Sequence, residues 1–359
     1  MDAVVRLENV TKSFFDKVII KDLDLEIYEG EFLTLLGPSG CGKTTILRMI
    51  SGLEHVSSGK VYIDNKDVTE VPPTKREVNT IFQNFALFPH MSVYDNIAFG
   101  LKMKKVPADE IDKQVKKVIK LVKLEGFEDR LPGQLSGGQQ QRVAIARGVV
   151  MNPKVLLLDE SLCSLDLKLK RAMQIELKKI QKKLGITFIY VTHDQDEALT
   201  MSDRIVIIDK GVIQQNDTPQ NIYMYPKTTF VADFIGESNI MSGEIVSISE
   251  NCTSVKIEDN IIFKIDYESG DEVGKKINIM VRPENIKIST NLLKDSIHGV
   301  IKDVIYDGAV TKIFVDTDGE LNLRVNAHGI VDLKEEDEVY LKMDKDSIVP
   351  IRGKNYEKK

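Results

Sequence analysis

The sequence predicts an α/β domain followed by a smaller all-β domain. Up to about residue 236, short apolar runs such as residues 32–36 and 188–191 alternate with segments of helical periodicity, as in residues 44–53 and 194–201. That alternation is typical of a largely parallel central sheet covered by helices. From residue 237 onward, strand-like runs separated by Asn, Asp and Gly turns dominate. We therefore expect two domains, residues 1–236 and 237–359.

Composition places the chain among ordinary globular proteins. Of its 359 residues, 42% are hydrophobic and 29% are charged, which suits a chain of about two domains. No apolar run approaches the roughly 18 residues that a membrane-spanning helix needs, and the first residues do not have the pattern of a signal peptide. The three cysteines, Cys41, Cys163 and Cys252, are widely spaced, so we expect reduced thiols rather than a metal site.

The charge balance argues against a nucleic-acid partner. Residues 237–359 carry 17 Lys/Arg against 24 Asp/Glu, and residues 1–236 carry 32 against 31. Neither part has the basic excess that binding to a phosphate backbone favours. The lysine-rich stretch 102–123 contains apolar residues at helical spacing, so we interpret its lysines as the solvated face of an amphipathic helix.

The second domain is expected to be a small β-barrel. Its strand-like runs are residues 243–248, 254–257, 277–281, 299–304, 312–315, 321–325 and 338–343. Two of them, beginning at Gly243 and Gly299, share a Gly-x-Ile/Val pattern. We interpret this similarity as a weak internal duplication, with chance resemblance as the alternative.

A glycine-rich loop between a strand and a helix indicates a phosphate site. Residues 37–45 fit Gly-x-x-x-x-Gly-Lys-Thr after the predicted strand 32–36 and open a helix near Thr44. Backbone N–H groups there can surround a β-phosphate at the positive end of the helix dipole. Lys43 would contact the β- and γ-phosphates, Thr44 would bind Mg²⁺ and Thr45 would assist at the α-phosphate. The residues expected to bind ATP in this loop are Gly37, Pro38, Ser39, Gly40, Cys41, Gly42, Lys43, Thr44 and Thr45.

Three further segments end at the predicted carboxyl edge of the sheet. Asp159 and Glu160 close the apolar run 155–158, and we assign Asp159 to the metal and Glu160 to the attacking water. His193 follows the run 187–192 and is expected to contact the γ-phosphate. Gln83 follows the run 78–82 and is a candidate both for catalysis and for Mg²⁺ binding. The predicted metal ligands are therefore Thr44, Gln83 and Asp159.

The string Leu135-Ser-Gly-Gly-Gln139 predicts a second anion-binding helix terminus. Ser136 offers a hydroxyl, Gly137 and Gly138 expose N–H groups, and we expect Gln139 to start the helix. One γ-phosphate does not need two such sites. If the second terminus faces a nucleotide that another copy holds, ATP is enclosed only in a dimer.

With these motifs, the chain resembles the ATP-binding subunits of ABC transporters over essentially its whole length. The resemblance implies an ABC ATPase cassette of the P-loop NTPase class, with a helical subdomain, and ATP hydrolysis with Mg²⁺. Gln83 falls at the family's Q-loop, Asp166 at its D-loop and His193 at its switch histidine. Phe14 falls at the aromatic that stacks on adenine, with Phe15 as the alternative.

The resemblance also implies a quaternary arrangement. In the family, two ATP molecules lie between two head-to-tail copies, and the residues corresponding to Ser136, Gly137, Gly138 and Gln139 act on the partner's nucleotide. We expect two membrane permease subunits, an indirect link to an extracytoplasmic solute-binding protein, and a peripheral location on the cytoplasmic face of the cell membrane. Two residues depart from the family pattern, Ser161 after the catalytic Glu and Cys163 before the D-loop.

The second domain narrows the expected function. Residues 281–284, Val-Arg-Pro-Glu, resemble the OB-like (TOBE) regulatory domain of importers for sugars, iron, sulfate and polyamines. Residues 84–100 and 30–37 most resemble the subunits of spermidine/putrescine importers. Another solute (sugar, ferric iron or sulfate) is the alternative within the family. Outside transport, the alternative is an ABC ATPase acting on nucleic acid or ribosomes, but the coiled coils, zinc sites or tandem cassettes of such proteins are not visible in the sequence.

Overall fold

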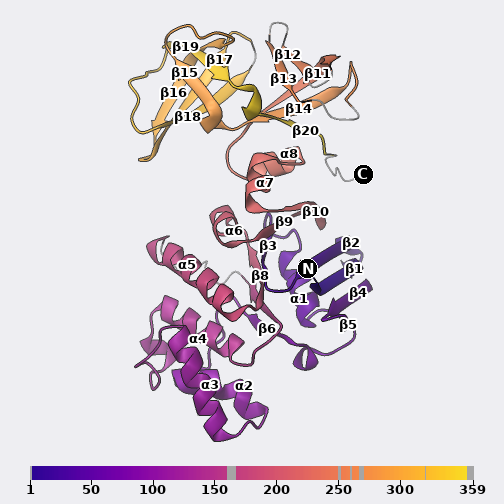
Figure 1. Cartoon of the computed structure of the whole chain (residues 1–359), viewed down its shortest axis with the longest axis vertical. Coiled ribbons are helices and arrows are strands. Elements are labelled where there is room, and N and C mark those ends of the chain that lie inside the picture. Colours follow the sequence, from indigo (N-terminus) through magenta and orange to yellow (C-terminus); the bar gives the residue numbers. More distant parts are fainter. Residues whose placement is uncertain are drawn as a thin grey trace. The chain divides into compact units, whose positions relative to one another are not determined.

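The computed structural model describes residues 2–159, 167–249, 252–258, 261–266, 271–319 and 321–353. The chain forms two compact units, Met1–Pro219 and Gln220–Lys359, and each is considered by itself (Figure 1). The first unit thus ends before the change of composition near residue 237. The assignment of functional domains as 1–236 and 237–359 stays a prediction.

A six-stranded sheet forms the centre of the first unit. Its order is β10 (Val212–Asp217), β9 (Arg204–Asp209), β3 (Phe32–Leu36), β8 (Thr187–Thr192), β7 (Val155–Asp159) and β6 (Val78–Ile81). All pairs are parallel except β10 with β9. Every residue of β3 and β8 is buried, as expected for parallel strands covered on both faces.

The first unit also contains a four-stranded antiparallel sheet. Its order is β2 (Lys17–Tyr28), β1 (Ala3–Phe14), β4 (Ser58–Ile63) and β5 (Lys66–Asp67). Helix α1 (Lys43–Ser51) contributes Ile46 and Leu47 to a core that also contains Leu33 of β3 and Leu7 of β1. Helix α1 is therefore fixed by apolar contacts to both sheets.

The predicted helical subdomain consists of α2 (Val93–Met103), α3 (Ala108–Leu121) and α4 (Gly137–Val149), which lie together at one end of the unit (Figure 1). Helix α3 buries Ile111, Val115 and Ile119, so the amphipathic interpretation of this lysine-rich stretch is confirmed. Two helices flank the main sheet, α5 (Leu167–Leu184) and α6 (Gln195–Met201). Short 3₁₀ turns lie at Pro73–Lys75 (η1) and Pro132–Gln134 (η2).

The second unit starts with two short helices and continues as β structure. Helix α7 (Pro219–Met224) begins at the boundary, and α8 (Thr229–Phe234) follows. One five-stranded sheet has the order β13 (Ile261–Ile265), β12 (Cys252–Glu258), β11 (Asn239–Ser249), β14 (Lys276–Val281) and β20 (Ile348–Ile351). The other has the order β15 (Ile286–Ser289), β19 (Glu338–Met343), β16 (Ile297–Tyr306), β17 (Val310–Thr317) and β18 (Asn322–His328).

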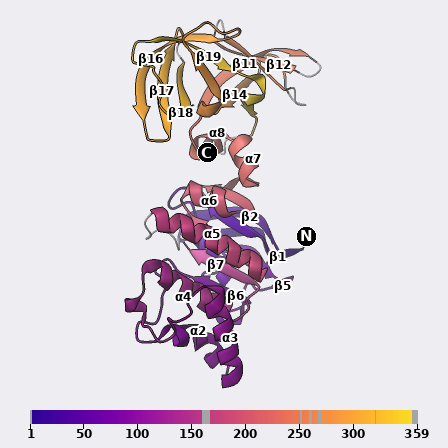
Figure 2. The ribbon, with the colours of Figure 1, turned by 60° about the vertical axis from the view of Figure 1, so that its left-hand side comes forward.

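The topology of these sheets confirms the predicted duplication. Strands β11 to β14 and strands β16 to β19 pair in the same order, and each set continues through a 3₁₀ turn, η3 (Pro283–Asn285) or η4 (Lys345–Ser347). Figure 2 shows β16, β17 and β18 grouped together and β11, β12 and β14 grouped together. The strand after each turn crosses to the other sheet: β15 pairs with β19, and β20 pairs with β14. A Cβ on Gly243 or Gly299 would lie 2.6 Å or 2.7 Å from a carbonyl oxygen of the neighbouring strand. At both positions, glycine therefore lets the neighbouring strand approach closely.

The two sheets enclose one apolar core, which includes Ile245 and Phe263 from the first sheet and Ile301 and Val325 from the second. A barrel-like all-β domain after a P-loop α/β domain is what the sequence predicts, and this fold class is confirmed. Strands β13, β15 and β20 were not among the strands predicted from the sequence. Among the described residues, no helix is long and apolar enough to cross a membrane.

Arg282, from the Val-Arg-Pro-Glu segment, attaches the two short helices to the second unit's sheet. Its buried guanidinium donates to the carbonyl oxygens of Tyr223, Ile235 and Glu237, at 2.6 Å, 2.6 Å and 3.0 Å. It also lies over the Tyr223 ring, 4.1 Å from the ring centroid. Hydrogen bonds to carbonyl groups offset the cost of burying this charge. Helices α7 and α8 are thus part of the second unit's structure.

Candidate functional site

The glycine-rich loop leaves the first turn of α1 open to an anion. The loop joins β3 to α1, and Gly42 is the N-cap residue of that helix, with φ of 108°. No side chain caps this helix end, and its first turn contains no acidic residue. The backbone N–H groups at a helix start need an external acceptor. Phosphate oxygens would meet that need.

Tight packing beneath the loop explains why glycines form it. A Cβ on Gly37 would lie 2.1 Å from the carbonyl oxygen of Ile208 in β9, and one on Gly42 would lie 2.4 Å from Ile20 Cδ1 in β2. A Cβ on Gly40, where φ is 78°, would meet nothing within 4 Å. The loop therefore rests on two strands and presents Gly40 on its open side. Its shape fits a phosphate chain that approaches the backbone closely.

Lys43 crosses above this loop. Its side chain donates to the carbonyl oxygens of Gly37, at 2.7 Å, and Pro38, at 2.8 Å, and it is buried. Its Nζ also lies 3.6 Å from Cys41 Sγ. Burial raises the pKa of the Cys41 thiol, and the nearby Lys43 charge offsets part of that effect. The loop thus holds a positive charge beside the helix terminus.

Thr44 and Asp159 are brought together from distant parts of the sequence. Thr44 Oγ1, in the first turn of α1, donates to Asp159 Oδ1, at the end of β7, over 3.1 Å. One hydroxyl and one carboxylate, completed by phosphate oxygens and water, form a donor set that suits Mg²⁺. Among the described residues, no group of three or more His, Cys, Asp or Glu side chains is placed to hold a metal by itself.

Strand register places the other predicted residues at the same sheet edge. Leu36 of β3 pairs with Thr192 of β8, Val191 of β8 pairs with Asp159 of β7, and Leu158 of β7 pairs with Ile81 of β6. His193 directly follows β8, and Gln83 comes two residues after β6. Gln83 and His193 are both exposed at this edge. Glu160 and Asp166, together with Ser161 and Cys163, lie outside the described residues.

The segment 135–139 forms the capped start of α4. The Ser136 hydroxyl accepts from the Gln139 N–H at 3.4 Å, and Gln139 Oε1 accepts from the Ser136 N–H at 2.9 Å. This is a reciprocal capping box. The helix begins at Gly137 rather than Gln139, so the predicted start was two residues late because Ser136, not Gly138, is the cap. Ser136 and Gly137 are exposed, whereas Gly138 is buried.

Two adjacent phenylalanines mark the end of β1. Phe14 is 40% exposed, and Phe15, in the turn to β2 with φ of 52°, is fully exposed. The Lys12 ammonium lies 4.6 Å from the centroid of the Phe14 ring, which fixes that ring by a cation–π contact. Lys12 was not predicted from the sequence as part of the site. The signal was available, because residues two apart on a strand share a face.

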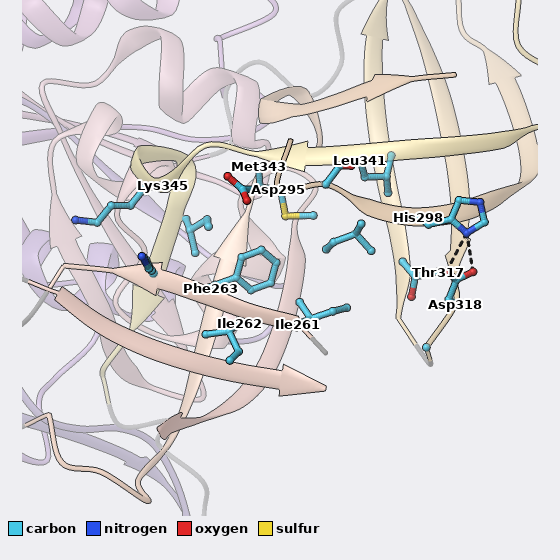
Figure 3. Close-up of a pocket in the computed structure, with 15 residues that line it drawn as sticks. Ile261, Ile262, Phe263, Asp295, His298, Thr317, Asp318, Leu341, Met343 and Lys345 are labelled. Carbon is cyan, nitrogen blue, oxygen red and sulfur yellow. Dashed lines mark hydrogen bonds and ion pairs between the residues drawn. The ribbon is translucent and has the colours of Figure 1, made fainter. Parts of the chain in front are cut away.

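A separate cavity of about 1070 Å³ opens in the second unit, between its two sheets (Figure 3). Phe263, Leu341 and Met343 contribute apolar surface to it. At one side, His298 Nδ1 lies 2.8 Å from Asp318 Oδ1. Its lining includes no residue of the glycine-rich loop. This cavity is therefore distinct from the candidate nucleotide site.

Comparison with known proteins identifies the family. A family model described as ABC transporter matches residues 20–162, and one described as TOBE domain matches residues 279–351. The chain is 53% identical to the spermidine/putrescine import ATP-binding protein PotA of Clostridium novyi over 87% of this chain and 88% of that protein. The chain belongs to the ABC transporter family.

Further relatives of this ABC transporter protein agree. The protein of the same name from Vibrio vulnificus is 50% identical, over 90% of this chain and 86% of that protein. The one from Acetivibrio thermocellus is 52% identical, over 89% of this chain and 88% of that protein. Among solved structures, cbiO1 of Clostridium perfringens, part of the ABC transporter complex cbiONQ, is 32% identical with a TM-score of 0.59. The match covers 62% of this chain and 91% of the cbiO1 chain.

A second solved structure shows the cassette as a dimer. The ATP-binding cassette MJ0796, in a post-hydrolysis state bound to ADP and Pi, is 34% identical with a TM-score of 0.53, over 60% of this chain and 98% of that chain. The resemblance that the sequence motifs predicted is thus confirmed. The chain has an ABC ATPase domain followed by a TOBE domain.

Proposed function

We propose that this chain is the ATP-hydrolysing subunit of an ABC importer that takes up a polyamine such as spermidine or putrescine. The observation that carries the proposal is the identity of about half of all residues, over most of the chain, to proteins named for spermidine/putrescine import. The geometry of the glycine-rich loop supports the nucleotide part of the proposal. An uncapped helix terminus, a buried lysine and a hydroxyl–carboxylate pair lie together there.

In the proposed mechanism, the loop 37–45 holds the phosphates and Lys43 supplies the positive charge. Thr44, Asp159 and Gln83 would hold Mg²⁺, which when bound would supply positive charge beside the phosphates. Glu160 and His193 orient the attacking water, which places general-base catalysis at the carboxyl edge of the sheet. Phe14, rather than the freely exposed Phe15, stacks on adenine, because Lys12 already fixes its ring.

We further propose that two copies enclose two ATP molecules, with residues 136–139 of each copy acting on the nucleotide of the other, and Asp166 at the interface. Two permease subunits carry the solute across the membrane. A solute-binding protein acts on the complex indirectly, and the chain works at the cytoplasmic face of the membrane. Nucleic acid has no part in this function.

The uptake proposal can be tested in reconstituted vesicles. The full chain, with the permeases encoded beside it and their solute-binding protein, is supplied with ATP and Mg²⁺ inside the vesicle and with spermidine, putrescine, maltose or ferric iron outside. We expect either polyamine to stimulate phosphate release and to accumulate. Stimulation by the sugar or iron alone would contradict the proposed solute.

The composite site can be tested by mixing inactive chains. Lys43→Ala removes the phosphate contact in one copy, and Ser136→Arg blocks the signature end in the other. If these residues act on one nucleotide from opposite copies, mixed dimers retain one intact site, and partial ATPase activity returns. No recovery at any mixing ratio would contradict the arrangement.

A further inference from the structure

A partly buried ionic cluster lies beside His193, at the ends of α5, α6 and β8. Lys170 is the fourth residue of α5, and its Nζ lies 2.6 Å from Asp194 Oδ2 and 2.8 Å from Glu197 Oε1. The Glu197 side chain is fully buried, and only 17% of the Lys170 side chain is exposed. A buried carboxylate needs a compensating charge, and Lys170 supplies it.

Both hydroxyl groups of β8 that reach this cluster donate to the same carboxylate. Tyr190 and Thr192 donate to Glu197 Oε2 at 2.5 Å and 2.6 Å. The Glu197 carboxylate thus accepts two hydroxyl groups through one oxygen and faces the ammonium with the other. This arrangement fixes the last residues of β8, directly before His193.

The residue after His193 is held by the same cluster. Asp194 is the N-cap of α6: its Oδ1 accepts from the Glu197 N–H at 3.0 Å, and its own N–H donates to Thr192 Oγ1 at 3.0 Å. The backbone of His193 is therefore fixed on both sides, through Thr192 and Asp194. Both anchors depend on carboxylates that Lys170 holds.

From this geometry we propose that Lys170 is a positioning residue for ATP hydrolysis, which sets the place of His193 through Asp194 and Glu197. The inference rests on the proposed function of His193 at the γ-phosphate. Helix α5 follows the segment that contains Glu160 and Asp166, so Lys170 also connects the chain after these two residues to the loop of His193.

The charge state of the cluster agrees with this role. Burial by itself would lower the pKa of Lys170, but the hydrogen bonds and charges of Asp194 and Glu197 outweigh it and raise the pKa to about 12. Burial would raise the pKa of Asp194, and Lys170 together with backbone N–H groups keeps it below its ordinary value. At neutral pH the ammonium and the Asp194 carboxylate are therefore both charged.

The substitution Lys170→Met tests the inference with little steric change. Lys170 borders a hollow of about 420 Å³ between α5 and α6, where an unbranched side chain of similar length fits. Lys170→Arg keeps the charge and can contact both carboxylates. Lys178→Met is the matched control, because Lys178 lies on the same helix and pairs with Asp203 at 3.4 Å, away from the cluster.

The experiment measures ATP hydrolysis by the purified full chain, its kcat and its KM for ATP, together with the thermal unfolding midpoint of each variant. We expect Lys170→Met to lower kcat about tenfold or more while KM stays within about twofold, since a displaced catalytic group slows the chemical step. Lys170→Arg should recover most of the lost rate, and Lys178→Met should match the wild type.

A second measurement separates positioning from a general loss of stability. Single-turnover rates are compared for His193→Ala with and without Lys170→Met, at a temperature where all variants are folded. If Lys170 acts through His193, the second substitution adds less than about twofold, because coupled residues are not additive. A tenfold further loss in the His193→Ala background would overturn the inference.

The outcomes also separate this inference from the proposed function. If the wild type hydrolyses ATP and the kcat of Lys170→Met equals that of Lys178→Met, the inference is overturned. The proposed ATPase function then remains in place. A full chain that binds ATP and Mg²⁺ without hydrolysing them, alone and with its permeases, would overturn the proposed function and the inference together.

Discussion

Thr44 Oγ1 donates a hydrogen bond to Asp159 Oδ1 over 3.1 Å. The two residues are far apart in sequence, one in the first turn of α1 and the other at the end of β7. Their side chains meet because β7 lies beside β8, and β8 beside β3, with their carboxyl ends at one edge. The contact joins the helix that follows the glycine-rich loop to the strand that leads to Glu160.

The first prediction concerns the metal. Asp159→Asn should raise the Mg²⁺ concentration that gives half-maximal ATP hydrolysis about tenfold or more, because a neutral amide is a weaker ligand than a carboxylate. The measurement is a Mg²⁺ titration of phosphate release at fixed ATP. Asp112→Asn, which removes an exposed ion pair with Lys116 on α3, is the control, and an equal titration curve for both variants would contradict the assignment.

The second prediction concerns Glu160. Glu160→Gln should keep ATP binding but lower turnover about 10²–10⁴-fold, the usual contribution of a positioned general base. Slow hydrolysis should also trap an ATP-bound dimer, which light scattering after size-exclusion chromatography would detect. A monomer with wild-type turnover would show that Glu160 has neither role.

The third prediction follows from Arg282. A fragment of residues 220–359 keeps the carbonyl acceptors of Tyr223 and Ile235, whereas a fragment of residues 237–359 loses both of these hydrogen bonds to the Arg282 guanidinium. The longer fragment should be more stable by about 3 kcal/mol or more, since hydrogen bonds to charged groups contribute strongly. Urea unfolding measures the difference.

Arg282→Met in both fragments is the control for that comparison. This substitution should remove most of the difference in unfolding free energy, because neither fragment then contains the hydrogen bonds from Arg282 to Tyr223 and Ile235. Equal stability of the two unsubstituted fragments would place the structural boundary at residue 237 after all.

The fourth prediction concerns the thiol in the glycine-rich loop. Burial raises the pKa of Cys41, so its reactive thiolate is scarce at neutral pH. In a Cys163→Ser background, Cys41 should react with iodoacetamide more slowly than the partly exposed Cys252 at pH 7.5. Its rate should still rise above pH 9, because the raised pKa shifts thiolate formation upward. Mass spectrometry of the labelled peptides measures both rates. Equal rates for Cys41 and Cys252 at pH 7.5 would contradict the prediction.

The site was predictable from sequence where it depends on short segments. A loop between a strand and a helix, and polar residues directly after apolar runs, locate Lys43, Asp159 and His193 at one sheet edge without knowledge of long-range contacts. The family resemblance supplied what such patterns cannot, namely that Ser136 acts across a dimer. That part, and the roles of the individual site residues, stay predictions.

The fold of the second unit was harder to predict in detail. The glycines at 243 and 299 indicated the duplication, but the exchange of β15 and β20 between sheets depends on pairing between distant strands, which no local pattern encodes. Arg282 is a similar case. Its sequence context gives no hint that its partners are carbonyl groups of α7 and α8. The cluster around Lys170 was missed for the same reason.

The capping box of α4 has a consequence for the proposed dimer. Within a single chain, the Ser136 hydroxyl oxygen accepts from the Gln139 N–H, and Gln139 Oε1 accepts from the Ser136 N–H. The cap uses the hydroxyl oxygen only as an acceptor, so in the proposed dimer Ser136 can donate its hydroxyl proton to a γ-phosphate on the partner copy while the cap stays intact. Loss of that phosphate would then remove a contact between the two copies and leave the start of α4 in each copy as it was.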